Sequence, residues 1–255
     1  MATPLFALDG RLALVTGSGQ GIGFALARGL AEHGAAVVLN GRNAGKIDEA
    51  VNTLRIAGHQ AHAAQFDVTD ASSIKPAIAR IEATIGPIDI LINNAGIQHR
   101  APLQDFPDEE WDRLIRTNLT GAFLVSKAVA PAMIARGKGK IINIGSVQSE
   151  LARPNIAPYT ATKGAIRNLT RGMCADWAKH GLQANAIAPG YFRTELNKAL
   201  IENPEFCAWL AQRTPAQRWG EVEELVGAAV FLASDASSFV NGHTLYVDGG
   251  IVASI

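Results

Sequence analysis

The sequence contains few cysteines, no excess of either charge sign and no long apolar run. Its two cysteines, Cys174 and Cys207, are not spaced as CxxC, which favours a reduced intracellular protein over a disulfide scaffold. Lys and Arg together number 23, as do Asp and Glu, so the basic excess expected of a protein that binds nucleic acid or anionic membranes is missing. No run approaches the roughly 18 apolar residues of a membrane span.

The start of the chain, "MATPLFALDGRLALVTG", also lacks a basic region before its apolar residues, which argues against a signal peptide. We therefore expect a soluble cytoplasmic protein with no nucleic-acid or membrane partner. The chain is rich in apolar residues: 48% of its 255 residues are hydrophobic and only 18% are charged. This composition is sufficient for a large buried core. No linker or repeat divides the chain, so residues 1–255 are predicted to form a single domain.

Short runs rich in Val, Ile and Leu alternate with helical patterns along the chain. Most runs lack strict polar alternation, which indicates strands buried on both faces, as in a parallel sheet. The expected strands cover residues 11–17, 35–41, 60–68, 88–96, 139–146, 182–190 and 243–250. The expected helices cover residues 21–33, 43–57, 71–85, 108–136, 158–180 and 222–234. This βαβ rhythm predicts an α/β fold, a Rossmann-type doubly wound sheet with helices on both faces.

One segment departs from this rhythm. Residues 191–220 form a long, aromatic and partly helical insert between the last two expected strands, and such inserts are usually lids or binding segments. Ligands of open α/β sheets bind beyond the carboxyl ends of the strands. We therefore expect the insert on the substrate side and the functional residues just after each strand.

The first expected strand ends in "TGSGQGIG", residues 16–23. Glycines in such a turn let the backbone approach a pyrophosphate, and the next helix directs its N-terminal amides at that anion. Because the pattern lies between a strand and a helix, it predicts a dinucleotide site. The residues expected to bind the cofactor here are Gly17, Ser18, Gly19, Gln20, Gly21, Ile22 and Gly23.

The end of the second strand distinguishes NADP from NAD. Asn40 stands where NAD sites carry an acid, and Arg42 follows; an arginine can clamp a 2′-phosphate that a carboxylate would repel. NADP is therefore favoured, unless Arg42 merely caps a solvated loop. Gln20 brings no second positive charge into the glycine loop, so use of NAD also stays open.

The third strand ends in "FDVTD". We expect Asp67 to accept a hydrogen bond from the adenine amino group and Val68 to flank the ring. Asp70 is expected to cap the helix that begins near Ala71, although either aspartate has the chemistry for the cap.

Tyr159 and Lys163 stand one helical turn apart, and Ser146 follows an expected strand. If the dinucleotide takes hydride from an alcohol, a base must take the hydroxyl proton, but a phenol with a pKa near 10 is a poor base at neutral pH. The charge of Lys163 would lower that pKa, its ammonium could hold the nicotinamide ribose, and Ser146 could fix the substrate oxygen. Taken alone, the pair is more often a surface pair and a serine after a strand more often a turn residue.

The order of the motifs resembles the short-chain dehydrogenase/reductase family over essentially the whole chain. The matching features are "TGSGQGIG", "NNAG" (93–96), Asn118, Ser146, "YTATK" (159–163) and "PG" (189–190). The resemblance implies a seven-stranded parallel sheet, NAD(P)-dependent carbonyl/alcohol chemistry and a homotetramer. It also implies a water-linked proton relay between Asn118, through its side chain or backbone, and Lys163. The further residues expected at the cofactor are Asn94, Ala95, Gly96, Pro189, Gly190, Phe192 and Thr194, together with Tyr159 and Lys163.

Within that family, "NNAGIQHRAPL" (93–103), "SVQSELARPNIAPYTATKGA" (146–165) and "RTPAQRWG" (213–220) are similar to gluconate 5-dehydrogenases. This similarity implies hydride transfer between NADP(H) and a sugar acid, D-gluconate or its 5-dehydro form. The alternatives are a reductase of another carbonyl, such as a 3-oxoacyl thioester, and a redox sensor. A sensor is disfavoured because the catalytic residues remain.

A sugar acid needs a cation for its carboxylate and polar groups for its hydroxyls. Arg100, beyond the fourth strand, is the candidate clamp; otherwise it forms a rim ion pair with Asp105. Gln98 and Gln148 could bind hydroxyls.

Glu150 could do the same, although its carboxylate would repel an anionic substrate unless paired, and it could instead bond Arg153. Tyr191 could close the pocket from the insert. Ser146 completes the substrate set. No His, Cys and Asp cluster has the spacing of metal ligands, and the chemistry needs no metal.

Overall fold

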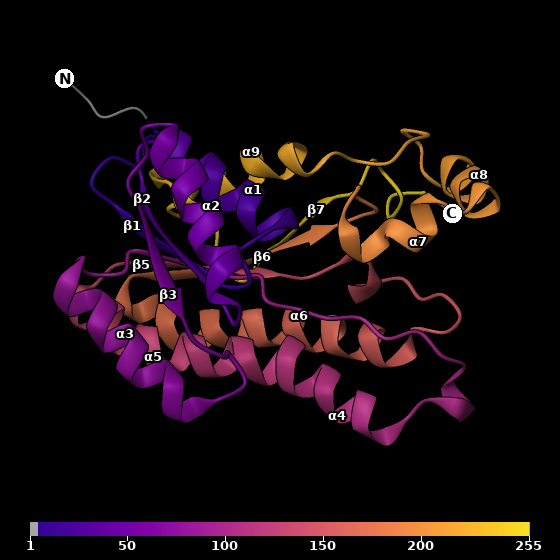
Figure 1. The fold of residues 1–255 in the computed structure, drawn as a ribbon, viewed down its shortest axis with the longest axis horizontal. Helices are drawn as coiled ribbons and strands as arrows, with labels where there is room; N and C mark the ends of the chain where they lie inside the picture. Colours follow the sequence, from indigo (N-terminus) through magenta and orange to yellow (C-terminus); the bar gives the residue numbers. More distant parts are fainter. Residues whose placement is uncertain (1–4, 255) are drawn as a thin grey trace.

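Seven parallel strands form one sheet in the computed structural model, which describes residues 5–254 (Figure 1). Their order is β3-β2-β1-β4-β5-β6-β7, so the predicted seven-stranded parallel Rossmann-type sheet is confirmed. The strands are β1 Leu12–Val15, β2 Ala36–Gly41, β3 Ala61–Gln65, β4 Ile90–Asn93, β5 Gly139–Ile144, β6 Leu182–Pro189 and β7 Thr244–Val247. All seven are shorter than predicted, mainly because the predicted ranges included glycine and polar residues that belong to the loops after the strands.

The helices lie where the helical patterns predicted them, with two additions in the insert. They are α1 Gly21–Glu32, α2 Ala44–Ile56, α3 Ala71–Thr84, α4 Asp108–Ile115, α5 Gly121–Arg136, α6 Ala157–Trp177, α7 Lys198–Ile201, α8 Pro204–Arg213 and α9 Val226–Ala233. The predicted cap of α3 is confirmed, because the Asp70 carboxylate accepts a hydrogen bond from the Ser72 amide at 2.9 Å.

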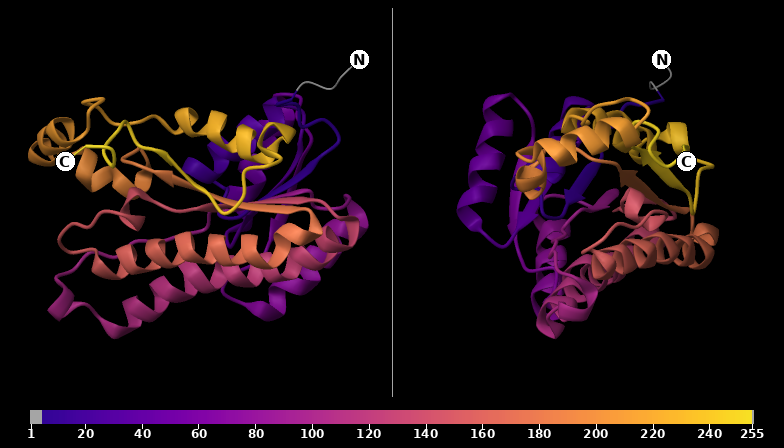
Figure 2. Two further views of the ribbon diagram at one scale, coloured as in Figure 1. Left: turned by 180° about the vertical axis from the view of Figure 1, so that it is seen from behind. Right: turned by 90° about the vertical axis from the view of Figure 1, so that its right-hand side faces the viewer.

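The sheet separates two helical layers and two cores (Figures 1 and 2). On β1, Ala13 and Val15 face α1, α2 and α9, whereas Leu12 and Leu14 face α3, α5 and α6. Both faces of a central strand are thus buried, which explains the unbroken apolar runs. Each fully buried aliphatic side chain contributes about 1.5–3 kcal/mol to stability, so the buried central strands anchor the fold.

The helix predicted over residues 108–136 is divided by a π-helical turn at Arg116–Thr120. Asn118 occupies this turn, and asparagine is a poor helix former whose side chain competes for backbone groups. The whole stretch Asp108–Arg136 is long and apolar enough to span a membrane by length and composition. Its residues Val125, Val129 and Met133 pack in the second core, as those of a core helix in a soluble protein do.

The carboxyl ends of the central strands lie at one edge of the sheet. The register pairs Val15 with Ile92 and Ile144 with Ile187, which brings the loops after β1, β4, β5 and β6 together. The insert with α7 and α8 projects beyond the same edge (Figure 2). Its predicted partly helical character is confirmed.

Candidate active site

A cavity of about 590 Å³ lies at this edge of the sheet. Nearly all residues that the sequence predicted for the site line it. From the predicted sets these are Gly17, Gln20, Gly21, Ile22, Gly23, Asn40, Arg42, Asp67, Val68, Asn94, Ala95, Gly96, Gln98, Arg100, Ser146, Gln148, Tyr159, Lys163, Pro189, Gly190, Tyr191, Phe192 and Thr194. Four predicted residues lie outside its wall, namely Ser18, Gly19, Asn118 and Glu150.

The glycine-rich loop is packed directly against the "NNAG" segment. Gly17 has φ +62°, and a Cβ there would lie 2.8 Å from the Cα of Ala95, so only glycine fits. The Asn94 side-chain amide donates to the carbonyls of Thr16 and Gly17, each at 3.0 Å. These contacts hold the loop open toward the cavity.

The N-terminus of α1 faces the cavity without a side-chain cap. Gln20 is its N-cap residue and makes no capping hydrogen bond, while Gly21, Ile22 and Gly23 line the wall. Free amides and the positive end of the helix dipole suit an anion such as a pyrophosphate. Ser18 instead stabilises the loop from behind, because its hydroxyl donates to Val15 O at 2.7 Å.

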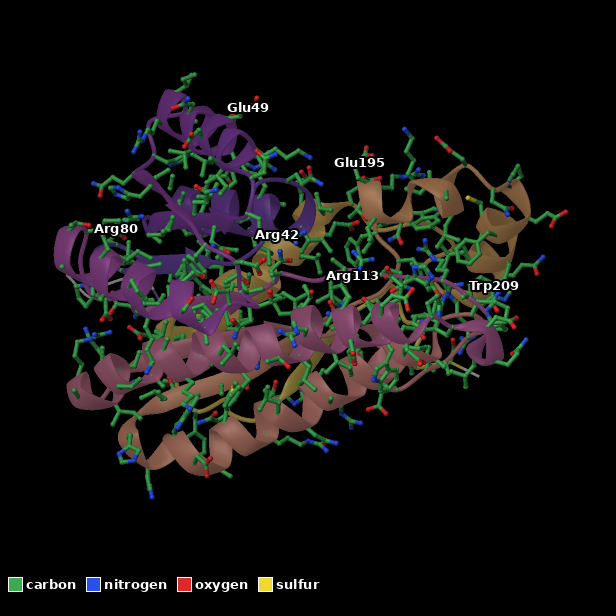
Figure 3. All side chains as sticks on the ribbon, turned by 60° about the horizontal axis from the view of Figure 1, so that its bottom comes forward. Arg42, Glu49, Arg80, Arg113, Glu195 and Trp209 are labelled. Atoms are coloured by element: carbon green, nitrogen blue, oxygen red, sulfur yellow. The ribbon has the colours of Figure 1, made fainter. Side chains whose placement is uncertain are left out.

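Of the two residues predicted at the end of β2, Asn40 is engaged in the protein and Arg42 remains available to a ligand. The Asn40 amide is buried and donates to the carbonyls of Ala64 and Phe66, so it ties β2 to β3. The Arg42 side chain is 75% exposed, and its Nη1 lies 4.0 Å from Asp67 Oδ2. A pair this long and exposed is weak, and it leaves the guanidinium available for a phosphate. Figure 3 shows Arg42 and, from the insert, Glu195, which also lines the cavity.

Lys46 is a cation that the sequence reasoning missed. It lies in the first turn of α2, and its Nζ donates to Gln20 Oε1 at 3.0 Å. A second positive charge therefore stands beside the glycine loop after all. Only the close packing of α2 on this loop reveals it, since a Cβ on Gly19 would lie 3.5 Å from the Lys46 Cβ.

Asp67 and Val68 lie together in the wall beyond β3. One carboxylate oxygen of Asp67 accepts from both the amide and the hydroxyl of Thr69 at 2.8 Å. The carboxylate is thereby oriented, with its second oxygen toward Arg42.

Ser146, Tyr159 and Lys163 meet in one wall of the cavity. Burial raises the pKa of Tyr159 to about 12, while a hydrogen bond with Ser146 and the charges of Arg100 and Arg153 lower it. The Ser146 hydroxyl also accepts from the Gln148 amide at 3.2 Å.

Lys163 is buried, and its Nζ donates to Ile144 O at 2.7 Å. Its ammonium lies 5.5 Å from the centre of the Tyr159 ring, and burial lowers its own pKa to about 8. The expected net lowering of the Tyr159 pKa by Lys163 is therefore wrong for this structure. Desolvation of the phenol outweighs every charge near it.

Asn118 lies behind the wall and braces it. Its side chain accepts from the Ile97 amide at 2.8 Å and donates to Ile97 O at 3.0 Å and to Thr162 Oγ1 at 3.3 Å. These hydrogen bonds tie the π-helical turn to the loop after β4 and to α6, which carries Tyr159 and Lys163.

The predicted substrate residues lie on facing loops. Gln148 Nε2 donates to Tyr191 Oη at 3.4 Å, and Arg100 Nη2 lies 3.5 Å from Leu196 O in the insert. The alternative ion pair of Arg100 with Asp105 is wrong: Asp105 accepts instead from Gln104. Arg100 is open to solvent at the cavity.

Glu150 turns away from the cavity. Its Oε1 lies 2.7 Å from Arg167 Nη2 and accepts from the Tyr246 hydroxyl at 3.1 Å. The alternative of a bond to Arg153 is therefore wrong, and the pairing with Arg167 neutralises the charge that made Glu150 an odd substrate residue.

Arg153, which the sequence suggested only as an alternative partner of Glu150, lines the cavity instead. Its place in "SVQSELARPNIAPY", between Ser146 and Tyr159, was the available signal. Within residues 5–254, no group of three or more His, Cys, Asp or Glu side chains is arranged to hold a metal ion.

Known proteins that resemble this chain in sequence and structure include dehydrogenases and reductases. A family model described as enoyl-(acyl carrier protein) reductase matches residues 17–252. A gluconate 5-dehydrogenase of Gluconobacter oxydans is 61% identical over 251 residues, 98% of each chain, and a 5-keto-D-gluconate 5-reductase of Escherichia coli is 55% identical over 98% of this chain and 99% of its own. The crystal structure of a gluconate 5-dehydrogenase from Burkholderia cenocepacia in complex with NADP and tartrate has a TM-score of 0.97 and 61% identity over 98% of both chains.

Proposed function

The chain belongs to the short-chain dehydrogenase/reductase family, and on that premise we propose that it interconverts D-gluconate and 5-dehydro-D-gluconate with NADP(H). The observation that carries the proposal is the composition of one cavity. It joins a glycine loop, the Ser146, Tyr159 and Lys163 side chains, and guanidinium groups beside them. Two relatives above 50% identity are named for this reaction, and a third was solved with NADP.

The residues fit the cofactor by their own chemistry. The uncapped N-terminus of α1 would hold the pyrophosphate, Arg42 and Lys46 the 2′-phosphate, and Asp67 the adenine. Lys163 would hold the ribose of the nicotinamide. When bound, NADPH supplies the hydride that the protein cannot supply itself.

In the reductive direction, Ser146 holds the C5 carbonyl oxygen and Tyr159 donates its phenolic proton to that oxygen as hydride arrives at the carbon. The alcohol forms and Tyr159 is left as the phenolate, which solvent reprotonates through Lys163 and water held by the Asn118 backbone carbonyl. Its raised pKa keeps Tyr159 protonated at neutral pH, so the resting site is ready for reduction. Oxidation of gluconate uses the same steps in reverse.

Residues 191–220 act as the substrate-side lid of the single NAD(P)-binding domain formed by residues 1–255. Support comes from Tyr191, Phe192 and Thr194, which line the cavity, and from Tyr191 and Trp219, whose rings pack at 5.9 Å. Gln98 and Gln148, which line the cavity outside the insert, hydrogen-bond the substrate hydroxyls.

The functional protein is a cytoplasmic homotetramer in this proposal. Trp111 on α4 and Phe123 on α5 are 42% and 44% exposed, and large apolar side chains on the outer helical layer suit burial against another copy.

A substrate assay tests the proposed function. The protein is mixed with 5-dehydro-D-gluconate and either NADPH or NADH, and loss of the reduced nicotinamide absorbance is followed. We expect turnover, faster with NADPH. Turnover of a 3-oxoacyl thioester or an unrelated ketone without turnover of the sugar acid would refute the gluconate assignment and support the alternative reductase.

A further inference from the structure

Two guanidinium groups stand in the cavity wall without an acidic partner. Arg100 follows β4, and Arg153 lies in the loop between β5 and α6. Within residues 5–254, neither forms an ion pair with a carboxylate. Partial burial lowers the pKa of Arg100, and the positive charge of Arg153 lowers it further. Two cations placed this close are stabilised when an anion joins them.

The loops that carry the two arginines are tied together. The Ala101 amide donates to Asn155 O at 3.2 Å, one residue after Arg100 and two after Arg153. Asn155 has φ +68°, a conformation that asparagine tolerates better than most residues. The backbone thus fixes the spacing of the two side chains before any ligand binds.

The insert holds both side chains. The Arg153 guanidinium lies 5.5 Å from the centre of the Phe206 ring of α8 and hydrogen-bonds Tyr191, while its buried Nε has no partner. Arg100 reaches Leu196 O. A planar guanidinium stacked on an aromatic ring keeps its edge directed at a ligand.

We propose that Arg153 is a second substrate-binding residue, which forms with Arg100 a two-arginine clamp for the substrate carboxylate. This inference rests on the proposed function and names the group that selects acids from neutral sugars. Both arginines act electrostatically on Tyr159, so the clamp lies near the reacting carbonyl. A neutral ketose leaves the two cations uncompensated and is therefore a poorer substrate than the acid.

The test compares Arg153→Met and Arg153→Lys with the wild type on 5-dehydro-D-gluconate and on a neutral ketohexose, L-sorbose. For Arg153→Met, we expect KM for the acid to rise about 10- to 100-fold, with a smaller change in kcat and no loss of kcat/KM for sorbose. Arg153→Lys keeps the charge but loses the contact of the planar guanidinium with the Phe206 ring, so its KM for the acid should lie between those of the wild type and Arg153→Met. Arg100→Ala should resemble Arg153→Met.

Arg193→Met is the matched control, because Arg193 lies in the same insert, pairs with Glu221 and does not line the cavity; its KM should stay at the wild-type value. An unchanged KM for the acid in Arg153→Met overturns the clamp. Equal losses on acid and sorbose also overturn it, because they indicate a structural role. Wild-type preference for a phosphorylated ketose over the acid overturns the choice of carboxylate.

Failure of the proposed function is separately visible as absent wild-type turnover of 5-dehydro-D-gluconate. The clamp is then tested by calorimetric binding of D-gluconate to the NADP-loaded wild type and Arg153→Met. Weaker binding by the variant supports the clamp. Equal binding, including none by either protein, overturns it.

Discussion

Tyr159 and Lys163 share one wall of the cavity, and burial shifts their pKa values in opposite directions. The phenol is held protonated, with a pKa of about 12, while the ammonium loses its proton near pH 8. At the scale of single residues, therefore, Tyr159 is protonated at neutral pH, whereas Lys163 loses its charge as the pH rises past about 8. Two experiments separate these roles.

Replacing Tyr159 with Phe removes the proton donor and keeps the ring. We expect kcat for ketone reduction to fall on the order of 1,000-fold, while NADPH binding, followed by cofactor fluorescence, changes little. Thr160→Val is the control on the same helix turn, since Thr160 does not line the cavity. Retained turnover in the phenylalanine variant would remove Tyr159 from the reaction.

The pH dependence of reduction reports on Lys163. Its charge is present below its pKa of about 8 and lost above it, whereas Tyr159 stays protonated in that range. If the ammonium is needed, kcat/KM for 5-dehydro-D-gluconate is level at low pH and declines above about pH 8. Lys163→Arg retains its charge and should move the decline to higher pH. A wild-type profile still level at about pH 9.5 would contradict this role.

At the scale of elements, the junction of β2 and α2 sets cofactor preference. Arg42 directly follows β2 and lines the cavity, and Lys46 lies in the first turn of α2, where it contacts Gln20 of the glycine loop. Figure 3 shows Arg42 near the centre of the molecule and Trp209 of α8 at its right-hand side. Neither cation depends on a strong ion pair in the protein.

Arg42→Ser should weaken NADPH binding about 10- to 100-fold and leave NADH binding nearly unchanged, because only NADPH carries the 2′-phosphate. Lys46→Met should act in the same sense with a smaller effect. Arg80→Met, on the distant helix α3 (Figure 3), serves as the control. Parallel loss of both cofactors from Arg42→Ser would indicate a damaged loop rather than a lost phosphate contact.

At the scale of the whole molecule, the outer helical layer carries apolar side chains that the single chain does not cover. Trp111 and Phe123 lie on α4 and α5, next to the π turn that holds Asn118 against the cavity. Assembly through this layer would therefore also steady the wall of the site.

Trp111→Glu places a charge where the proposed tetramer excludes water, so we expect dissociation to smaller species in light scattering after size exclusion. Trp111→Phe, which remains apolar, should stay assembled. A wild-type protein that elutes as a monomer, or a tetrameric Trp111→Glu, would show that α4 is not part of an interface.

The sequence by itself determined the sheet, the order of its elements and most of the cavity wall. Strands buried on both faces leave unbroken apolar runs, and local patterns at strand ends and at the start of α6 indicated Gly17, Ser146 and Tyr159, which line the cavity. The cap at Asp70 was equally local. Such features depend on a few neighbouring residues, which the chain order displays directly.

Only the tertiary structure decided which distant charges meet. Lys46 approaches Gln20 because α2 packs on the glycine loop, Glu150 pairs with Arg167 from α6, and Arg153 is left to the cavity beside Arg100. The burial that raises the pKa of Tyr159 is likewise a sum over segments far apart in the chain. Electrostatic pairing and desolvation depend on distance in space, and no spacing along the sequence contains that distance.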